Sequence, residues 1–239
     1  MTRIQTAIPG FDKMLRGGFL PGRNILLSGP AGSGKTTFAA QYLYNGVMLH
    51  NEPALYVTLE ESPDKIYEDM AKFGFNLKRA EKRGLRIIGG PISSVTGYMD
   101  KVDAKVHDII EEIKEIIKEN GIKRVAIDSI NLFTMLLEKD SDKRRALAAL
   151  GNMLSSSGCT SLLLSETREG TMRLSRYGIE EFVVDGVVVL YLARQGSQFV
   201  PGIAIRKMRG TEHDKEIKLY RITEKGVVVY PEETLFTNI

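Results

Sequence analysis

Short apolar runs alternate with longer segments of helical periodicity over the first two thirds of the chain. The runs predict buried strands, because each is brief and is bounded by glycine, proline or polar residues. The predicted strands cover residues 25–27, 54–59, 85–88, 124–128 and 161–165. The segments between them, of which 106–117 and 142–154 are the clearest, predict helices. This alternation predicts a mostly parallel sheet with right-handed crossovers and with helices on its faces.

The pattern changes after residue 182. Apolar segments now follow one another with turns between them and no helical pattern, at residues 187–193, 202–208, 216–222 and 227–230. Glu224-Lys225-Gly226 is typical of a hairpin turn between the last two segments. We therefore expect an α/β fold in which the C-terminal third extends the parallel sheet with antiparallel strands.

Composition narrows the class of protein. A length of 239 residues and a hydrophobic content of 43% predict one domain over residues 1–239. The net charge of +3 is only mildly basic, so it allows a nucleic-acid partner without indicating one. The single cysteine, Cys159, excludes an intrachain disulfide framework, and its apolar setting favours a buried structural thiol. No stretch approaches the ~20 apolar residues of a membrane span, and the N-terminus lacks a signal peptide's apolar core. We therefore expect a cytoplasmic protein with no membrane partner.

A glycine-rich segment between the first predicted strand and the next helix matches the P-loop pattern G-x-x-x-x-G-K-[ST]. Its glycines allow backbone N–H groups to turn inward and hold phosphate oxygens, and the helix N-terminus adds positive charge there. Lys35 is expected to reach the β- and γ-phosphates, and the Thr36 hydroxyl to bind Mg²⁺. The segment therefore predicts binding of ATP with Mg²⁺ by Gly29, Pro30, Ala31, Gly32, Ser33, Gly34, Lys35, Thr36 and Thr37.

Acidic residues follow two other predicted strands, at the sheet edge where parallel sheets gather ligand chemistry. Asp128 ends an apolar strand, where P-loop proteins need a direct or indirect Mg²⁺ ligand; the alternative is a helix or turn cap. Glu60 and Glu61 end the strand at 54–59. One of them can deprotonate the water that attacks the γ-phosphate. Equally, both can be acids that suit the dipole of the following helix.

Basic residues end the segment at 202–208. Lys207 and Arg209 alternate along a predicted strand and would therefore face the same side. The simpler interpretation is a solvated strand face. The alternative is an arginine finger that reaches the phosphates of a neighbouring subunit.

Several of these segments together resemble the KaiC branch of the RecA-like ATPases, over residues 8–230. The resemblance rests on the motifs at residues 8–12, 29–37, 58–62, 127–129, 177–185 and 207–213. It implies a RecA-type core with ATP between the subunits of a homo-oligomeric ring, which we expect to be hexameric. It implies that Glu60 and Glu61 are the catalytic pair and that Ser165-Glu166 is a sensor. The residues implied to approach the adjacent subunit's nucleotide are Lys207, Met208, Arg209, Thr211 and His213.

The chain departs from KaiC in size, since KaiC carries two such domains and this chain has the length of one. We expect a Mg²⁺-dependent ATPase that acts as a regulatory or motor-like protein on a protein partner. One alternative is a recombinase-like protein that binds single-stranded DNA, suggested by Arg168, Arg173 and Arg176 after the fifth predicted strand. Against this alternative, we expect no N-terminal helical domain like that of archaeal and eukaryotic recombinases. A further alternative, suggested by the family alone, is an autokinase.

Overall fold

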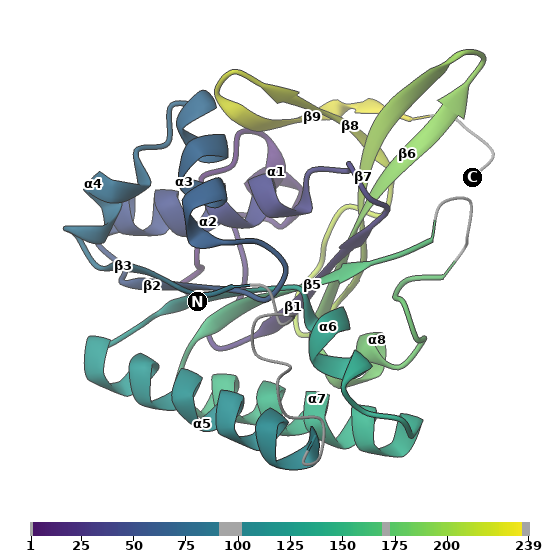
Figure 1. Cartoon of the computed structure of the whole chain (residues 1–239). Helices are drawn as coiled ribbons and strands as arrows, with labels where there is room; N and C mark the ends of the chain where they lie inside the picture. Colours follow the sequence, from purple (N-terminus) through teal and green to yellow (C-terminus); the bar gives the residue numbers. More distant parts are fainter. Residues whose placement is uncertain (1, 91–101, 169–172, 236–239) are drawn as a thin grey trace.

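The computed structural model describes residues 2–90, 102–168 and 173–235. The strands form one nine-stranded sheet in the order β3-β2-β4-β5-β1-β6-β7-β8-β9 (Figure 1). The strands from β3 to β6 are parallel to their neighbours, and those from β6 to β9 pair antiparallel. Their bounds are β1 Asn24–Gly29, β2 Ala54–Thr58, β3 Leu85–Gly89, β4 Arg124–Asp128, β5 Thr160–Glu166, β6 Gly186–Gln195, β7 Gln198–Met208, β8 Lys218–Thr223 and β9 Gly226–Thr234. The predicted fold class is confirmed.

Helices cover both faces of the parallel part of the sheet (Figure 1). One face carries α1 (Phe11–Met14), α2 (Lys35–His50), α3 (Pro63–Lys72) and α4 (Leu77–Glu81). The other carries α5 (Val102–Asn120), α6 (Ile130–Met135), α7 (Asp140–Ser156) and α8 (Glu180–Val183). The buried apolar residues fall into two clusters, one under each layer of helices. Among the described helices, none is long and apolar enough to cross a membrane.

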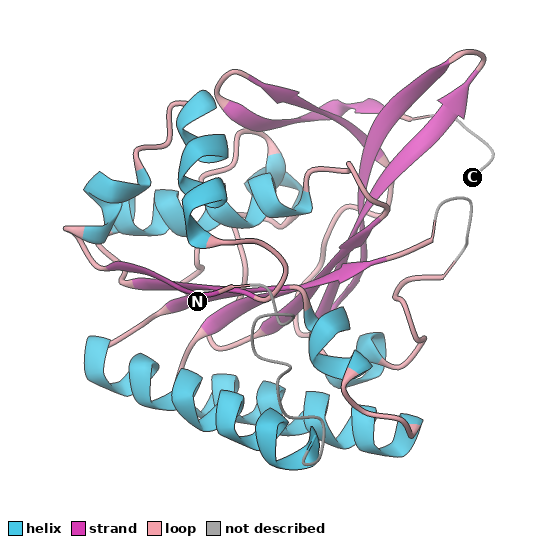
Figure 2. Cartoon of the chain, viewed as in Figure 1, coloured by secondary structure: helices cyan, strands magenta, loops and turns pink. Residues whose placement is uncertain are grey.

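The antiparallel strands continue the sheet beyond β1 and add residues such as Val188, Ile203 and Val229 to one of the two core clusters. Figure 2 shows β6 and β7 as a long hairpin that projects past the helices, and β8 and β9 as a second hairpin. β9 packs against α1 and α2. The sheet therefore curves at β8 and β9 toward the side that carries α2, the helix that follows the P-loop (Figure 1).

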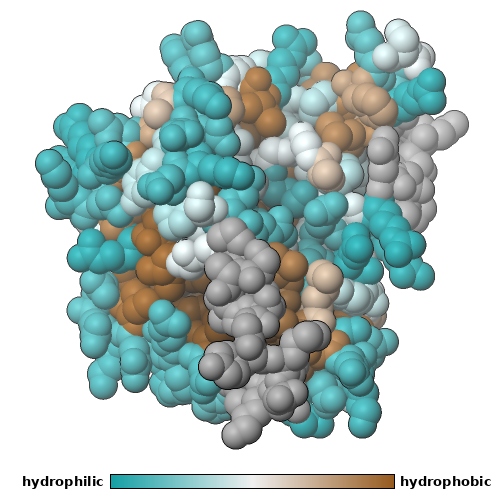
Figure 3. All heavy atoms as spheres, in the orientation of Figure 1, coloured by the Kyte–Doolittle hydropathy of each residue, from teal (hydrophilic) through white to brown (hydrophobic). Residues whose placement is uncertain are grey.

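The molecular surface reflects this arrangement. Figure 3 shows hydrophilic residues over the outward sides of the helices and a cluster of apolar residues at the edge of the sheet where β2 and β3 lie. β3 is an edge strand of the sheet, and its Ile87 and Ile88 are only half-buried. One long edge of the parallel sheet is thus partly apolar.

A buried arginine begins β4. The Arg124 side chain is 1% exposed, and its Nε lies 2.5 Å from the Glu52 carboxylate. The guanidinium also donates to the Tyr42 carbonyl at 3.2 Å and stacks 4.8 Å from the Tyr42 ring. It packs directly on α2 at Gly46, where an added Cβ would lie 2.4 Å from Arg124 Cδ and Nε. The Arg124 guanidinium must stay paired because it is buried, and its position therefore requires glycine at residue 46 in the middle of α2.

We predict that Gly46→Ala destabilises the protein by about 2 kcal/mol, as expected for overpacking. Alanine would normally stabilise a helix interior by about 1 kcal/mol relative to glycine. Here Arg124 cannot move aside, because Glu52 and Tyr42 hold it. Gly151→Ala in α7 is the matched comparison, since its Cβ would lie 3.2 Å from Asn24 Nδ2, a tight contact but far less severe than the one at Gly46. Urea unfolding of the two variants measures the difference, and equal stabilities would contradict the explanation.

Candidate nucleotide-binding site

The loop between β1 and α2 has the geometry that a phosphate cradle requires. Gly34 caps α2 with a φ of 82°, in the left-handed region that favours glycine. A Cβ at Gly34 would also lie 2.4 Å from the Ile222 side chain of β8. The Ser33 carbonyl accepts a hydrogen bond from the buried Tyr220 hydroxyl at 2.6 Å. The β8–β9 hairpin therefore supports the loop from behind, a contact that the local sequence pattern did not predict.

Lys35 begins α2 and turns back over the loop. Its ammonium donates to the carbonyls of Gly29 and Pro30 at 3.0 and 2.9 Å. Burial lowers the pKa of Lys35, while the carboxylates of Glu166, Asp128 and Glu60 act in the opposite direction. Three carboxylates from three different strand ends are thus close enough to influence one amine.

The strand register explains why these carboxylates meet. Gly29 of β1 is level with Glu166 of β5, and Thr58 of β2 is level with Asp128 of β4. All four strands end at the same edge of the sheet, as the sequence predicted for a parallel arrangement. Glu166, one of the two residues implied as a sensor, therefore lies beside the P-loop. Its backbone N–H donates to the Asn131 side chain at 2.6 Å, a contact that sequence reasoning missed.

Asp128 is the most buried of these acids. Its Oδ2 accepts hydrogen bonds from the Thr36 hydroxyl and from the Tyr56 hydroxyl, both at 2.7 Å. Burial raises the pKa of Asp128, and the hydrogen bonds from Tyr56 and Thr36 act against this. Burial and the nearby negative charge of Asp128 raise the pKa of Tyr56, which stays a protonated donor. The structure brings together the two predicted metal ligands, Thr36 and Asp128, and adds Tyr56, which the sequence analysis missed.

These oxygen donors fit Mg²⁺. A hydroxyl that donates its proton to Asp128 keeps its lone pairs, so Thr36 can bind a cation without losing that hydrogen bond. Mg²⁺ usually takes one or two protein ligands and completes its shell with water and substrate phosphates. Within the described residues no cluster of three His, Cys, Asp or Glu side chains could hold a metal ion. The arrangement therefore suits a cation that arrives with a nucleotide.

Glu60 and Glu61 lie side by side in sequence but differ in their contacts. The Ser129 hydroxyl donates to the Glu60 carboxylate, which links Glu60 to the residue after Asp128. The Glu61 backbone pairs with Thr58, whose hydroxyl donates to the Glu61 carbonyl at 2.7 Å. Both side chains are exposed. Both also precede Ser62, the N-cap of α3, so neither lies in the first turn of that helix. The geometry thus gives the helix-dipole interpretation less support than a role at the strand end.

The segment 207–213 lies at the opposite end of the sheet from the P-loop of the same chain. Through β6, Met208 is level with Ile25, near the start of β1, whereas the P-loop follows the end of β1. Arg209 lies one residue farther still, and its backbone N–H bonds to the Asp185 carbonyl. Five residues of strand separate Asn24 from Gly29, or about 16 Å. The structure therefore does not bring these residues to the nucleotide site of their own chain.

The side chains of this segment have contacts of their own. Lys207 Nζ donates to the carbonyls of Glu181 and Val184 at 2.8 and 2.7 Å. Burial lowers the pKa of Lys207, and the charge of Arg209 adds to that effect. The Arg209 side chain is 58% exposed, with Nη1 3.9 Å from Asp185 Oδ1. β7 ends at Met208, so Arg209 lies one residue beyond the strand, yet its charge still reaches Lys207; the shared face of the two residues stays a prediction.

The remaining residues of the segment also contact residues of their own chain. Met208 is buried against Gly186. The Thr211 hydroxyl accepts a hydrogen bond from Arg3 at 2.7 Å, and His213 Nδ1 lies 2.8 Å from the Asp214 carbonyl. The arginine-rich segment considered for DNA, residues 168–176, falls partly outside the described residues, which omit 169–172.

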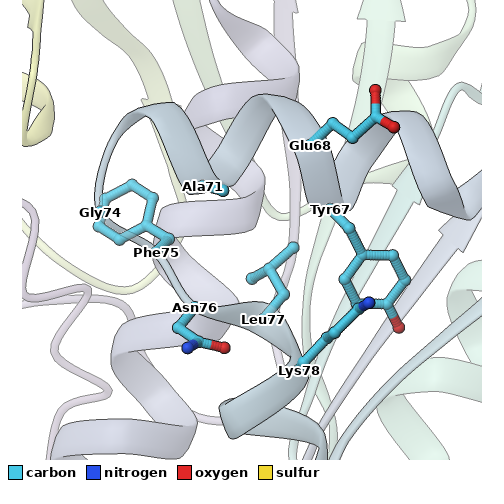
Figure 4. A pocket seen from close by; sticks show the side chains of 8 residues that line it. All are labelled: Tyr67, Glu68, Ala71, Gly74, Phe75, Asn76, Leu77 and Lys78. Atoms are coloured by element: carbon cyan, nitrogen blue, oxygen red, sulfur yellow. The ribbon is translucent and has the colours of Figure 1, made fainter.

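A separate cavity of about 410 Å³ opens between α3 and α4 (Figure 4). Its lining residues are Tyr67, Glu68, Ala71, Gly74, Phe75, Asn76, Leu77 and Lys78. None of them belongs to the P-loop or to the strand ends around Lys35. The cavity is therefore distinct from the candidate nucleotide site.

Comparison with known proteins confirms the resemblance and the RecA-like fold. The family model described as "ATPase: KaiC" matches residues 4–234. A UPF0273 protein of Pyrococcus horikoshii is 35% identical over 241 residues, which cover 98% of this chain and 96% of that protein. The circadian clock oscillator protein KaiC of Parathermosynechococcus lividus is 35% identical over 95% of this chain, which spans 42% of that protein. The crystal structure of a KaiC-like protein from Pyrococcus horikoshii superposes with a TM-score of 0.85 and 36% identity, covering 96% and 99% of the two chains.

We predict that Lys35→Ala lowers ATP affinity by about 100-fold or more, because charge-assisted hydrogen bonds contribute up to about 3 kcal/mol. Arginine would not replace the compact ammonium. Equilibrium binding of a fluorescent ATP analogue measures the change. Lys65→Ala, which removes an exposed lysine from α3, is the control and should bind like the unmodified chain. Wild-type affinity in Lys35→Ala would contradict the assignment of the site.

Proposed function

We propose that this chain, which belongs to the KaiC family of RecA-like ATPases, hydrolyses ATP with Mg²⁺ at the interfaces between its own copies. The described residues would act as one ATPase domain within a homo-oligomer, a closed hexameric ring in the arrangement that we favour. The turnover would serve a regulatory or motor-like role on a partner.

In this proposal the residues around Lys35 bind and orient the triphosphate. Lys35 exchanges its hydrogen bonds to the Gly29 and Pro30 carbonyls for phosphate oxygens, and the loop N–H groups hold the same phosphates. Thr36 and Asp128 hold Mg²⁺, which supplies positive charge to the phosphate oxygens. Hydrolysis needs these groups, because charge spreads over the γ-phosphoryl oxygens in the transition state.

Glu60 is the proposed general base. Its carboxylate accepts the Ser129 hydroxyl beside Asp128, so it is oriented at the strand edge where the γ-phosphate would lie. Its exposure allows a water molecule to approach. Glu61, whose contacts involve its backbone, would assist by adding negative charge and by fixing the turn. A general base contributes roughly 100- to 10,000-fold to a rate.

One observation carries the proposal that the site is completed by a neighbour. Arg209 lies about 16 Å along the strands from the P-loop of its own chain, yet its side chain is more than half exposed. A cation so placed can serve a nucleotide only on another subunit. Contacts between two different faces of identical chains are head-to-tail, and they either close into a ring or continue as a filament. This supports an assembly in which each subunit supplies Arg209, with Lys207 beside it, to the next.

We predict that Arg209→Ala and Glu60→Gln are each nearly inactive and that their mixture is active. Loss of a finger should lower the hydrolysis rate at least about a thousandfold while ATP still binds. In a randomly mixed ring, about one quarter of the interfaces pair an intact Glu60 with an intact Arg209. The mixture should therefore recover about one quarter of the wild-type rate, measured as phosphate release.

Arg79→Ala, which removes an exposed arginine from α4, is the matched control and should hydrolyse ATP normally. Subunit exchange in the mixture is followed by native mass spectrometry of the two variants, one of them isotope-labelled. If exchange is complete and the mixture stays inactive, the finger does not act between subunits.

A further inference from the structure

We propose that Tyr56 is a positioning residue that aims the Asp128 carboxylate at the Mg²⁺ ion of the bound nucleotide. The inference rests on the proposed function, because it assigns a part in metal binding to a residue outside the recognised motifs. Tyr56 lies in the middle of β2, where the sequence pattern predicts only a core residue.

The first step is the register between β2 and β4. Tyr56 pairs with Ala126, and Asp128 lies two residues farther along β4 on the same face. Two residues of strand cover about 6.6 Å, a span that a tyrosine side chain can bridge with its hydroxyl. Ala126 has the small side chain that leaves room for the ring. A phenylalanine would fill the same space but would not reach the carboxylate with a donor.

The second step is the use of the carboxylate oxygens. Tyr56 and Thr36 both donate to Oδ2 of Asp128, each at 2.7 Å. The χ2 torsion of aspartate is normally broad, so two donors on one oxygen fix an orientation that the backbone does not. Oδ1 would then be left to serve the metal or one of its water ligands. Hydrogen bonds to an ionised carboxylate are also the strong kind, which suits a buried acid.

The third step separates the two donors. Thr36 lies at the P-loop and is the proposed direct metal ligand, so its contacts change as nucleotide and metal arrive. Tyr56 is 1% exposed and lies behind the carboxylate, away from solvent. Its hydroxyl is thus the donor that remains fixed in every nucleotide state. Tyr56 would therefore keep Asp128 oriented before the metal binds.

Tyr42 offers a matched comparison within the same core. It is also fully buried, but its hydroxyl donates to the Thr160 carbonyl at 3.2 Å, away from any site carboxylate. Tyr42→Phe and Tyr56→Phe each remove one buried hydroxyl and keep the ring. Only Tyr56→Phe removes a donor from Asp128.

The test measures metal and nucleotide affinity separately in the full-length chain. ADP affinity is measured by calorimetry in EDTA, and Mn²⁺ affinity of the ADP complex by electron paramagnetic resonance. We expect Tyr56→Phe to bind ADP in EDTA within about twofold of wild type. We expect its Mn²⁺ affinity to fall roughly 10- to 100-fold, the usual effect of losing a residue that orients a metal ligand. Tyr42→Phe should match wild type in both measurements.

If the wild-type ADP complex binds Mn²⁺ and Tyr56→Phe binds it with the same affinity, the role of Tyr56 is overturned while the proposed function stands. An equal loss of ADP affinity with and without metal would also overturn it, because it would indicate a disturbed loop. Failure of wild type to bind Mn²⁺ with ADP would instead contradict the proposed function. The ADP affinity of Tyr56→Phe in EDTA guards against misfolding, because a misfolded chain would lose nucleotide binding with and without metal.

Discussion

The carboxyl ends of β1, β2, β4 and β5 meet at one edge of the sheet, and the charges gathered there constrain the rest of the structure. An ammonium, Lys35, sits among carboxylates from three strands. Buried charges of opposite sign must remain paired and hydrogen-bonded, since an isolated one is costly. The strand register brings these charges near one another without any long loop, while the Lys35 ammonium donates to the carbonyls of Gly29 and Pro30. It also leaves the charges on one edge, where triphosphate and Mg²⁺ can enter together.

The second constraint is that the strands of the sheet have two ends, one at the P-loop and one away from it. Residues at the start of β6 and the end of β7 lie near the start of β1, with Asp185 holding Arg23 at 3.0 Å and Arg209 nearby. Because β7 runs antiparallel to β6, which is parallel to β1, the basic segment 207–213 follows β7 at the opposite strand ends from the nucleotide site. In our account this separation is what makes the protein depend on its own copies. Lys207, whose ammonium is held by the carbonyls of Glu181 in α8 and Val184 just after it, would then help fix the face that meets the neighbour.

Much of this could be predicted from the sequence, because the signals are local. Apolar runs and helical periodicity fix the strands and helices, and the spacing from Gly29 to Thr36 identifies the P-loop. Contacts between distant elements carry no such signal. In the sequence, Tyr56 resembles any core residue of a strand. Only the register of β2 with β4 shows that its hydroxyl reaches Asp128. Tyr220 reaches Ser33 across 187 positions, and Arg124 requires a glycine in a helix far away in sequence. The common face predicted for Lys207 and Arg209 stays a prediction, because β7 ends at Met208, between the two residues.

In the proposed function, a complete nucleotide site needs two subunits. It is tested most directly by measuring the ATP hydrolysis rate per subunit over a range of protein concentrations, with the assembly state determined by analytical ultracentrifugation at each. The account predicts that the rate per subunit rises with the assembled fraction and approaches zero where the protein is monomeric. A rate per subunit that stays constant down to a monomeric population would contradict it.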